Sequence, residues 1–282
     1  MNKSDNDNNV REAEGEVLSN SDLARPGEVF PNVIHLLPVA ARPFFPGQAV
    51  PLVMDAKSWD PTLQAVMGTA HKLIGIVLTD ADSAEETGTD DFYRMGTLGR
   101  VHRAHTVDGV LQVLVECLQR FQLDEFLSSE IPFSAHVSYV PEPAKRTGDE
   151  VKAYAMAIIN TIKELLPLNP LYQEELRMFL DRFGPDDPSH LADFAASLTT
   201  SDRHQLQEVL ETIDLLPRME RVLVLLQKET EMARAQQRIR QSVEEKMQNQ
   251  QREFLLREQL KAIQKELGIE KDDRTAEVEK FQ

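Results

Sequence analysis

One stretch limits what this chain can fold into more than any other: no glycine or proline occurs between Pro217 and Gly268. The stretch is rich in Gln, Glu, Arg and Lys, which favours a single continuous helix. Pro217 suits a first helical position, and Gly268 suits the position just past a helix end. A helix of this length would extend about 75 Å at 1.5 Å per residue, so no small domain could cover it.

The apolar residues divide this expected helix into three parts. The first part has a broad apolar face that can pack against a globular core, and it comprises Met219, Val222, Leu223, Leu225 and Leu226. In the middle part the apolar residues thin to a seam, which consists of Met232, Ile239, Val243 and Met247. An apolar face returns at the far end with Phe254, Leu255, Leu256, Leu260, Ile263 and Leu267.

A polar helical middle frays easily when it stands alone. We therefore expect the seam to lie along a partner helix, another subunit or a part of the protein outside this chain. Met232 and Met247 favour this interpretation, because methionine is an adaptable contact residue. The alternative is a solvated helix that only joins two folded parts. The candidate contact residues are Met232, Ile239, Val243, Met247, Phe254, Leu255 and Leu256.

Charge and composition argue against several classes of partner. The net charge is −16, and charges of both signs alternate along the basic stretch 218–268, so nucleic acid is a weak candidate. Cys117 is the only cysteine, so an intrachain disulfide is impossible and a reducing compartment is expected. The start of the chain lacks a secretory signal, and no run approaches about 18 apolar residues. We expect a cytoplasmic chain with no membrane partner.

The region 29–140 has the texture of a β-rich domain, with short apolar runs separated by turn residues. Strands are expected at residues 33–38, 49–54, 73–79, 100–107, 110–116, 118–126 and 131–140. Asp108-Gly109 is typical of a two-residue hairpin turn. Asp60-Pro61 predicts the start of one short helix. These elements predict a compact sheet or a partial barrel.

Phe44 and Phe45 lie in the turn between the first two expected strands. Paired aromatic residues beside such a turn commonly fill the end of a barrel. The alternative is an exposed tip that contacts protein substrates. Both residues are therefore kept as weaker candidates for substrate contact.

After residue 140 the apolar spacing changes to the helical period. Helices are expected at 151–166, 171–183, 190–198 and 202–216, and their bundle would receive the apolar start of the long helix. The predicted organisation is a disordered tail at 1–28, the β-rich domain at 29–140, a linker at 141–147, a helical subdomain at 148–216, the long helix at 217–268 and a tail at 269–282. The predicted fold class is α+β.

The chain contains no catalytic or nucleotide-binding motif. A phosphate-binding loop of the Walker type needs a glycine followed by lysine, and no glycine here is followed by lysine. His102 and His105 would point to opposite faces of one strand, which disfavours a shared metal ion. The acidic loop 80–91 lacks the ligand spacing of a calcium loop. We expect no cofactor or metal in this chain, and a role in recognition and assembly.

Several segments together resemble one family. The segment from Gln251 to Gly268 is similar to the helix that precedes the ATPase module in the Lon ATP-dependent proteases. Further similarity lies in Leu37-Pro38, Phe45-Pro46-Gly47, Tyr93 to Thr97, Val113 to Arg120 and Gln207 to Asp214. The resemblance covers residues 33–268 in order. Phe254 and Leu255 depart from it, because family members commonly carry two tyrosines there.

The resemblance implies a PUA-like pseudobarrel, a helical companion subdomain and a long helix toward a motor ring. It implies the substrate-recognition region of a homohexameric ATP-dependent serine protease that degrades misfolded and regulatory proteins in the bacterial cytoplasm. The implied partners are unfolded or damaged proteins and further subunits. ATP and Mg²⁺ would bind in an ATPase module after Gln282, and proteolysis would follow in a further domain. A stand-alone coiled-coil adaptor without a motor is the alternative.

Overall fold

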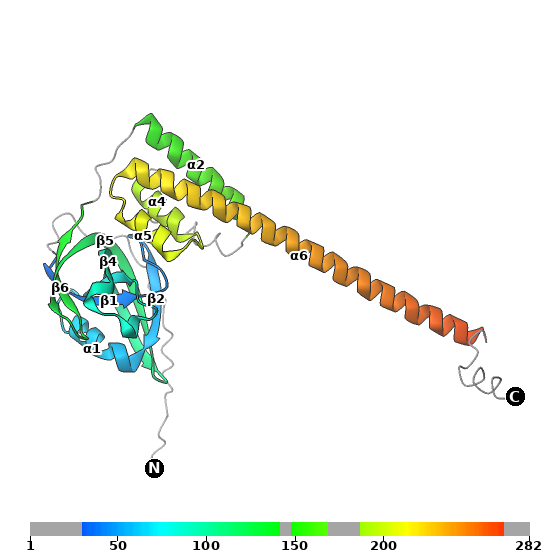
Figure 1. The fold of residues 1–282 in the computed structure, drawn as a ribbon, viewed down its shortest axis with the longest axis horizontal. Coiled ribbons are helices and arrows are strands. Elements are labelled where there is room, and N and C mark those ends of the chain that lie inside the picture. The colour runs from blue at the N-terminus through cyan, green and yellow to red at the C-terminus, as the bar shows by residue number, and fades with distance from the viewer. Residues whose placement is uncertain (1–29, 142–147, 169–186, 268–282) are drawn as a thin grey trace, which may run out of the picture.

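The computed structural model describes residues 30–141, 148–168 and 187–267. The predicted tails, the helix expected at 171–183, Gly268 and all but the first residue of the predicted linker lie outside these ranges. Figure 1 shows a β-barrel, a group of helices beside it and one helix that extends far beyond both. This arrangement confirms the predicted α+β class.

Six strands form one sheet, and five of them close into a ring. The strands are β1 (Val33–Val39), β2 (Ala49–Asp55), β3 (Leu73–Thr79), β4 (Phe92–Val107), β5 (Val110–Ser128) and β6 (Ser134–Tyr139). The order is β2-β5-β4-β3-β1-β6, and an additional pairing of β5 with β6 closes the ring. β1 and β3 are parallel, and the other pairs are antiparallel. β2 pairs only with β5 among the described strands, so it forms a free edge.

The hairpin between β4 and β5 has the predicted turn. Asp108 and Gly109 have φ angles of 52° and 80°, the left-handed values that a tight two-residue hairpin requires. The strands expected at 110–116 and 118–126 are instead one strand, β5, of 19 residues. Register shifts in its ladders mark bulges, so β5 bends and pairs first with β2 and β4 and then with β6.

Phe121 fills the centre of the barrel. Its side chain is fully buried and lies against Gly75 of β3 and Gly96 of β4. A Cβ atom added to either glycine would stand 2.8 Å from the tip of the Phe121 ring, closer than carbon atoms pack. The two glycines therefore make room for one aromatic ring.

The helix α1 (Ala56–Met67) begins earlier than predicted. Its N-cap is Asp55, whose carboxylate accepts a hydrogen bond from the Ser58 amide at 2.9 Å. The prediction of a start at Asp60-Pro61 is wrong, because the buried Trp59 holds the preceding turn against the barrel core. Pro61 consequently lies inside the helix.

Three helices beside the barrel receive the start of the long helix. They are α2 (Asp149–Leu165), α4 (Pro188–Ser197) and α5 (Arg203–Glu211). The long helix, α6 (Leu215–Glu266), has 52 residues and packs its first turns against α2 and α4. Met219, Val222 and Leu226 are fully buried there, as the broad apolar face predicted.

The boundary between α5 and α6 differs from the prediction. α5 ends at Glu211 and not near Leu216, because the backbone at Thr212 is extended. Asp214, also extended, precedes α6. Pro217 is thus the third helical residue and not the first. Proline is accepted there because the amides of a first helical turn have no partner within the helix.

Candidate protein-binding surface

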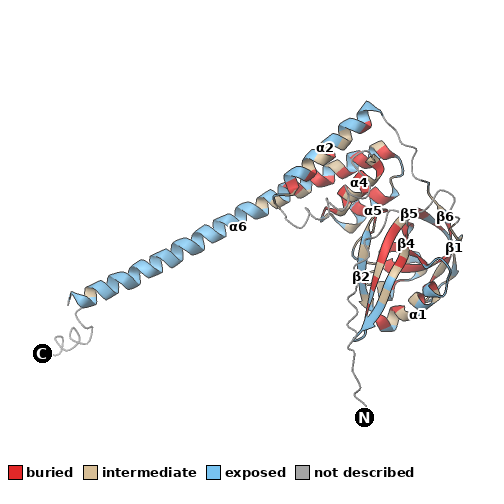
Figure 2. Ribbon diagram, turned by 180° about the vertical axis from the view of Figure 1, so that it is seen from behind, coloured by how far each residue is buried: buried red, intermediate tan, exposed pale blue. Residues whose placement is uncertain are grey.

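The distal part of α6 leaves the globular body and carries its apolar residues in solvent. Burial along the helix ends at Thr230, whose side chain is 3% exposed and donates a hydrogen bond to the Leu226 carbonyl. No side chain from 231 to 267 is buried in the described part of the chain. Figure 2 shows this part of the helix as exposed almost throughout.

Five apolar side chains of this exposed part share one side of the helix. They are Met232, Ile239, Val243, Met247 and Phe254, and they are called the middle stripe below. At 3.6 residues per turn, their spacings of seven, four, four and seven residues place them within an arc of about 80°. Each is at least 50% exposed. The four predicted seam residues and Phe254 therefore form one continuous surface that a partner can contact.

A second apolar row occupies another side of the same helix. It consists of Leu256, Leu260, Ile263 and Leu267, and it is called the terminal stripe below. The same geometry places its centre about 130° around the axis from the middle stripe. The sequence analysis grouped Phe254, Leu255 and Leu256 as one contact cluster. The helix separates them, because Phe254 belongs to the middle stripe, Leu256 to the terminal stripe and Leu255 to neither.

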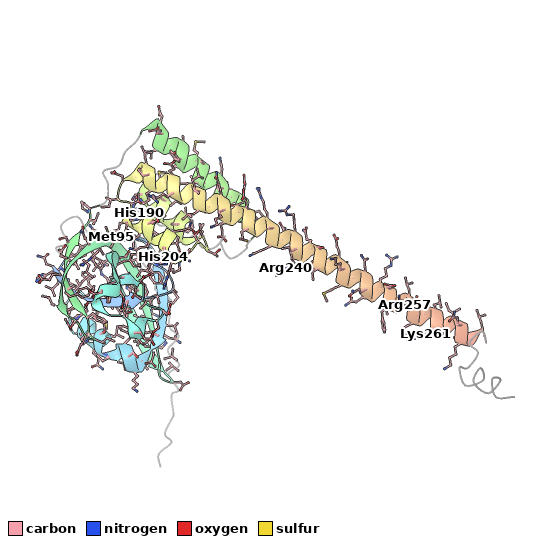
Figure 3. All side chains as sticks on the ribbon, in the orientation of Figure 1. Met95, His190, His204, Arg240, Arg257 and Lys261 are labelled. Carbon is pink, nitrogen blue, oxygen red and sulfur yellow. The ribbon has the colours of Figure 1, made fainter. Side chains whose placement is uncertain are left out.

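Charged side chains surround the two stripes. Arg240, Arg257 and Lys261 project from the exposed part of α6 (Figure 3). Arg257 donates to Glu253 at 2.7 Å, and Lys261 lies 3.5 Å from Glu258. Both are pairs of exposed side chains along one helix, which contribute only a few tenths of a kcal/mol. They keep the helix soluble but do not hold its apolar stripes in place.

Phe44 and Phe45 lie in a different environment. Phe45 is 0% exposed and belongs to the core formed with the helices, while Phe44 is half-buried against the barrel core. The Phe45 amide donates to the Gln48 side chain at 2.7 Å, and the Phe44 carbonyl accepts from Thr97 at 2.6 Å. An exposed aromatic tip is therefore not present. Burial removes Phe45 from the candidate surface, and the pair instead joins the barrel to the helices.

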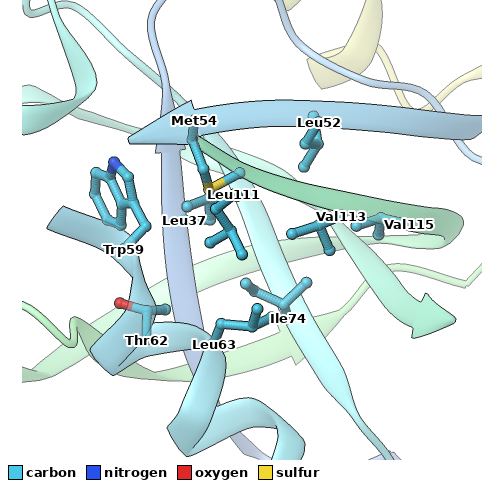
Figure 4. Close-up of a pocket in the computed structure, with 10 residues that line it drawn as sticks. All are labelled: Leu37, Leu52, Met54, Trp59, Thr62, Leu63, Ile74, Leu111, Val113 and Val115. Atoms are coloured by element: carbon cyan, nitrogen blue, oxygen red, sulfur yellow. The ribbon is translucent and has the colours of Figure 1, made fainter. Parts of the chain in front are cut away.

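A small void lies inside the described part of the barrel. Figure 4 shows a void between β1, β2, β3, β5 and α1 that is lined by ten residues, of which Thr62 alone carries a side-chain hydroxyl. The void is about 10 Å³, about enough for one water molecule. It is a packing gap in the apolar core.

A buried ionic junction sets the position of α6 relative to the barrel. Arg120 of β5 binds both carboxylate oxygens of Asp193 of α4, at 2.8 and 2.6 Å. Arg218 of α6 lies 3.5 Å from the same carboxylate and donates to the Ser189 hydroxyl at 2.7 Å. The three charged side chains are each no more than 2% exposed. The junction therefore joins strand, bundle and long helix at one point.

The pKa of the Asp193 carboxyl group reflects the charges around it in this junction. Burial alone would raise the pKa of this carboxyl group, but the guanidinium groups of Arg120 and Arg218 outweigh it and hold the pKa below its ordinary value. Asp193 therefore stays ionised in the folded protein at neutral pH. Its charge is satisfied by two partners from different elements.

Further polar contacts join the barrel to the helices. Arg203 of α5 donates to the carbonyl groups of Ala40 and Ala81, and Gln207 donates to the Met95 carbonyl. Sequence reasoning missed these residues and the ionic junction. A signal exists for Arg218, which precedes the buried Val222 by four residues and so lies on the apolar face of α6.

Two general findings concern the described residues. They contain no group of three or more His, Cys, Asp or Glu side chains placed to hold a metal ion. None of the described helices is both long enough and apolar enough to cross a membrane.

The fold and surface can now be compared with known proteins. Residues 33–228 match the family described as ATP-dependent protease La (LON) substrate-binding domain. The chain belongs to the Lon family. It is 47% identical over 252 residues to Lon protease 2 of Hydrogenovibrio crunogenus. It is 44% identical over 256 residues to Lon protease 1 of Syntrophotalea carbinolica.

These alignments place the Lon domain within longer proteins. They cover 89% and 90% of this chain but 29% and 31% of the two relatives. The chain thus spans about a third of the length of these Lon proteases. A solved structure, the N-terminal domain of the Mycobacterium avium complex Lon protease, has the same fold. Its TM-score is 0.54 at 21% identity, with 69% of this chain and 98% of that chain covered.

Proposed function

We propose that this chain is the substrate-recognition and oligomer-forming N-terminal region of an ATP-dependent serine protease. In this role it binds unfolded or apolar segments of misfolded and regulatory proteins and also contacts further copies of itself, as in a hexamer. The family described as a substrate-binding domain and the relatives named Lon protease support the proposal.

The middle stripe carries this proposal. Its five apolar side chains are each at least 50% exposed, so water contacts them all. The last described contacts of α6 with the body are the packing of Ala233 and the ion pair of Arg234 with Glu164 of α2 at 2.8 Å. Removal of this apolar area from water would stabilise a complex by roughly 25 cal/mol for each Å² buried. A protein partner, either another subunit or an unfolded substrate, would supply the covering surface. Several copies in one assembly would raise the effective concentration of binding sites around one substrate, so contacts that are weak singly would bind it more tightly together.

We assign catalysis to the part of the Lon proteases that lies outside the region aligned with this chain. ATP and Mg²⁺ would act there, because neither the sequence nor the described side chains of this chain offer a phosphate loop or a group of metal ligands. We place the protein in the cytoplasm. The adaptor alternative is less well supported, because the relatives continue far beyond the region aligned here.

A double substitution tests the middle stripe. In Met232→Glu/Met247→Glu two carboxylates enter the proposed apolar contact, so we expect cross-linking to a denatured substrate and self-association to weaken at least about tenfold. Photo-cross-linking and analytical ultracentrifugation measure the two effects. Gln241→Glu/Gln248→Glu is the matched control, because it adds the same charge on the opposite side of the helix.

The two readouts can separate the roles of the stripe. If only self-association weakens, the middle stripe contacts subunits and another surface binds substrate. If the folded Met232→Glu/Met247→Glu variant behaves like its control in both measurements, the middle stripe has no part in the function.

A further inference from the structure

We propose that the free edge of β2 binds an extended, basic-flanked apolar peptide segment by strand addition. This inference rests on the proposed function and gives it a second site, on the barrel and away from α6. The partner is a segment of an unfolded protein. A folded surface would not offer the row of free backbone groups that an added strand requires.

The hydrogen bonds of β2 show which backbone groups face outward. The Cys117 amide donates to the Gln48 carbonyl at 2.8 Å, and the Ala56 amide donates to the Gly109 carbonyl at 3.0 Å. The even-numbered residues at both ends therefore turn their backbone groups toward β5. Because this direction alternates along an antiparallel strand, the odd-numbered residues from 49 to 55 turn theirs away from the sheet.

Pro51 agrees with this assignment. Pro51 is odd-numbered and lies opposite Leu114. Proline has no amide hydrogen, and because this position turns away from β5, no hydrogen bond between β2 and β5 is lost. The amide and carbonyl groups of Ala49 and Val53 remain at the open edge, together with the Pro51 carbonyl and the Asp55 amide. The Asp55 carbonyl lies at the N-cap of α1 and accepts the first hydrogen bond of that helix. The edge thus presents a donor and acceptor pattern that an extended peptide can match from Val53 onward.

Exposed apolar side chains lie next to this edge. Val53 is 68% exposed, Val107 is 50% exposed and Val110 is 38% exposed. Val110 pairs with Val107 on one side and with Asp55 on the other, so the three valines belong to adjacent ends of β2, β5 and β4. Alternate side chains of an added strand would extend this apolar face.

Charge selects the kind of peptide. Residues 31–140 contain 7 Lys and Arg against 13 Asp and Glu, a difference of −6. Arg120 and Glu116 are both buried, and without them the count is 6 against 12, so the exposed part keeps the difference of −6. Lys or Arg beside the apolar segment complements such a surface, and Glu or Asp does not. A second copy of the same acidic barrel is disfavoured at this edge for the same reason.

The test uses the full chain and a synthetic peptide of alternating Val and Thr with Lys at both ends. Fluorescence anisotropy measures its binding to Val53→Pro, in which only an outward amide is lost and an apolar side chain is kept. We expect binding to weaken about tenfold, the effect of one lost hydrogen bond together with an unpaired peptide carbonyl. Val53→Thr keeps the amide and nearly the same shape, and it should change binding less than about threefold. Leu127→Ser changes an exposed residue at the other end of β5 and should leave binding unchanged.

Two further measurements guard against misfolding and mistaken charge. Methylation of the peptide amides on one edge should weaken binding to the unchanged chain, whatever Val53→Pro does to folding. A twin peptide with Glu in place of Lys should bind more weakly. Equal binding by the methylated peptide overturns strand addition, and equal binding by the Glu twin overturns the charge selection. If the unchanged chain forms dimers in the absence of peptide and Val53→Pro abolishes them, the β2 edge binds a second copy of the chain. That result would also overturn the inference.

The failure of this inference differs from failure of the proposed function. If the unchanged chain captures neither the peptide nor a denatured substrate, the recognition role itself is wrong. If it captures denatured substrate and Val53→Pro captures it equally well, only the β2 edge is excluded.

Discussion

Asp193 connects the barrel to the helices at a buried point of their interface. It lies fully buried between two guanidinium groups, one from the barrel and one from α6. A buried ion pair contributes little net stability when intact, but loss of one partner leaves a buried charge uncompensated. The junction therefore determines the geometry more than the total stability.

Asp193→Asn tests this junction. We expect the free energy of unfolding, measured in urea at pH 7, to fall by about 3–5 kcal/mol. The folded-state pKa of Asp193 is depressed, so its stabilising effect is present above the ordinary Asp pKa of about 3.9 and is lost as pH falls through the folded value. The difference between the two proteins should therefore shrink at the lowest pH.

Glu208→Gln is the control for this measurement. Glu208 pairs with Arg221 at 2.8 Å, but both side chains are at least half exposed, so its loss should cost under about 1 kcal/mol. Equal losses in the two variants would show that the buried junction has no special role.

Gly96 is a second position where one residue limits the packing. In Gly96→Ala the new methyl group would stand 2.8 Å from the Ile76 carbonyl and from the Phe121 ring. Backbone cannot yield as a flexible side chain does, so we expect a loss of about 1–3 kcal/mol in thermal or urea unfolding. Gly148→Ala, with open space around its Cβ position, should change stability by less than about 0.5 kcal/mol. A neutral Gly96→Ala would mean that the barrel centre is loosely packed.

At the scale of the element, α6 is one helix whose two parts are stabilised in different ways. Its first turns are held by burial against α2 and α4, whereas its distal part relies on helix propensity and pairs along its own surface. The middle and terminal stripes face different directions. One straight partner helix cannot cover both, so we infer separate contacts for them.

Hydrogen exchange tests this division of α6. In dilute protein we expect amides of residues 219–230 to be protected and those of residues 235–260 to exchange much faster, because only the first group lies under packed side chains. Protection of the second group should rise when self-association is driven by concentration. Equal protection in both groups at low concentration would show that the distal helix needs no partner.

The whole molecule carries two proposed binding surfaces on different elements. The β2 edge lies on the barrel, and the middle stripe lies on a helix of 52 residues, about 78 Å long at 1.5 Å per residue. The ionic junction fixes the direction in which this helix leaves the body. A substrate held at the barrel and a subunit held along the helix could therefore be bound at once.

The sequence alone predicted the features that depend on local physics. The long helix followed from the absence of Gly and Pro between Pro217 and Gly268, and the hairpin followed from Asp108-Gly109. The apolar spacing identified the seam of Met232, Ile239, Val243 and Met247, and its contact with a partner stays a prediction. Errors arose at Asp60-Pro61 and at Pro217, where proline signals were followed although packing of Trp59 and an extended Thr212 set the actual helix starts.

The sequence by itself determined the apolar period of the elements, the length of the long helix and the position of the hairpin turn, because these depend on neighbours along the chain. The burial of Phe45, the meeting of Arg120 with Asp193 and Arg218, and the free edge of β2 depend on residues that are far apart in sequence. Only the tertiary structure decides such features, because the cost of burying a charge or leaving an edge open is set by what packs beside it.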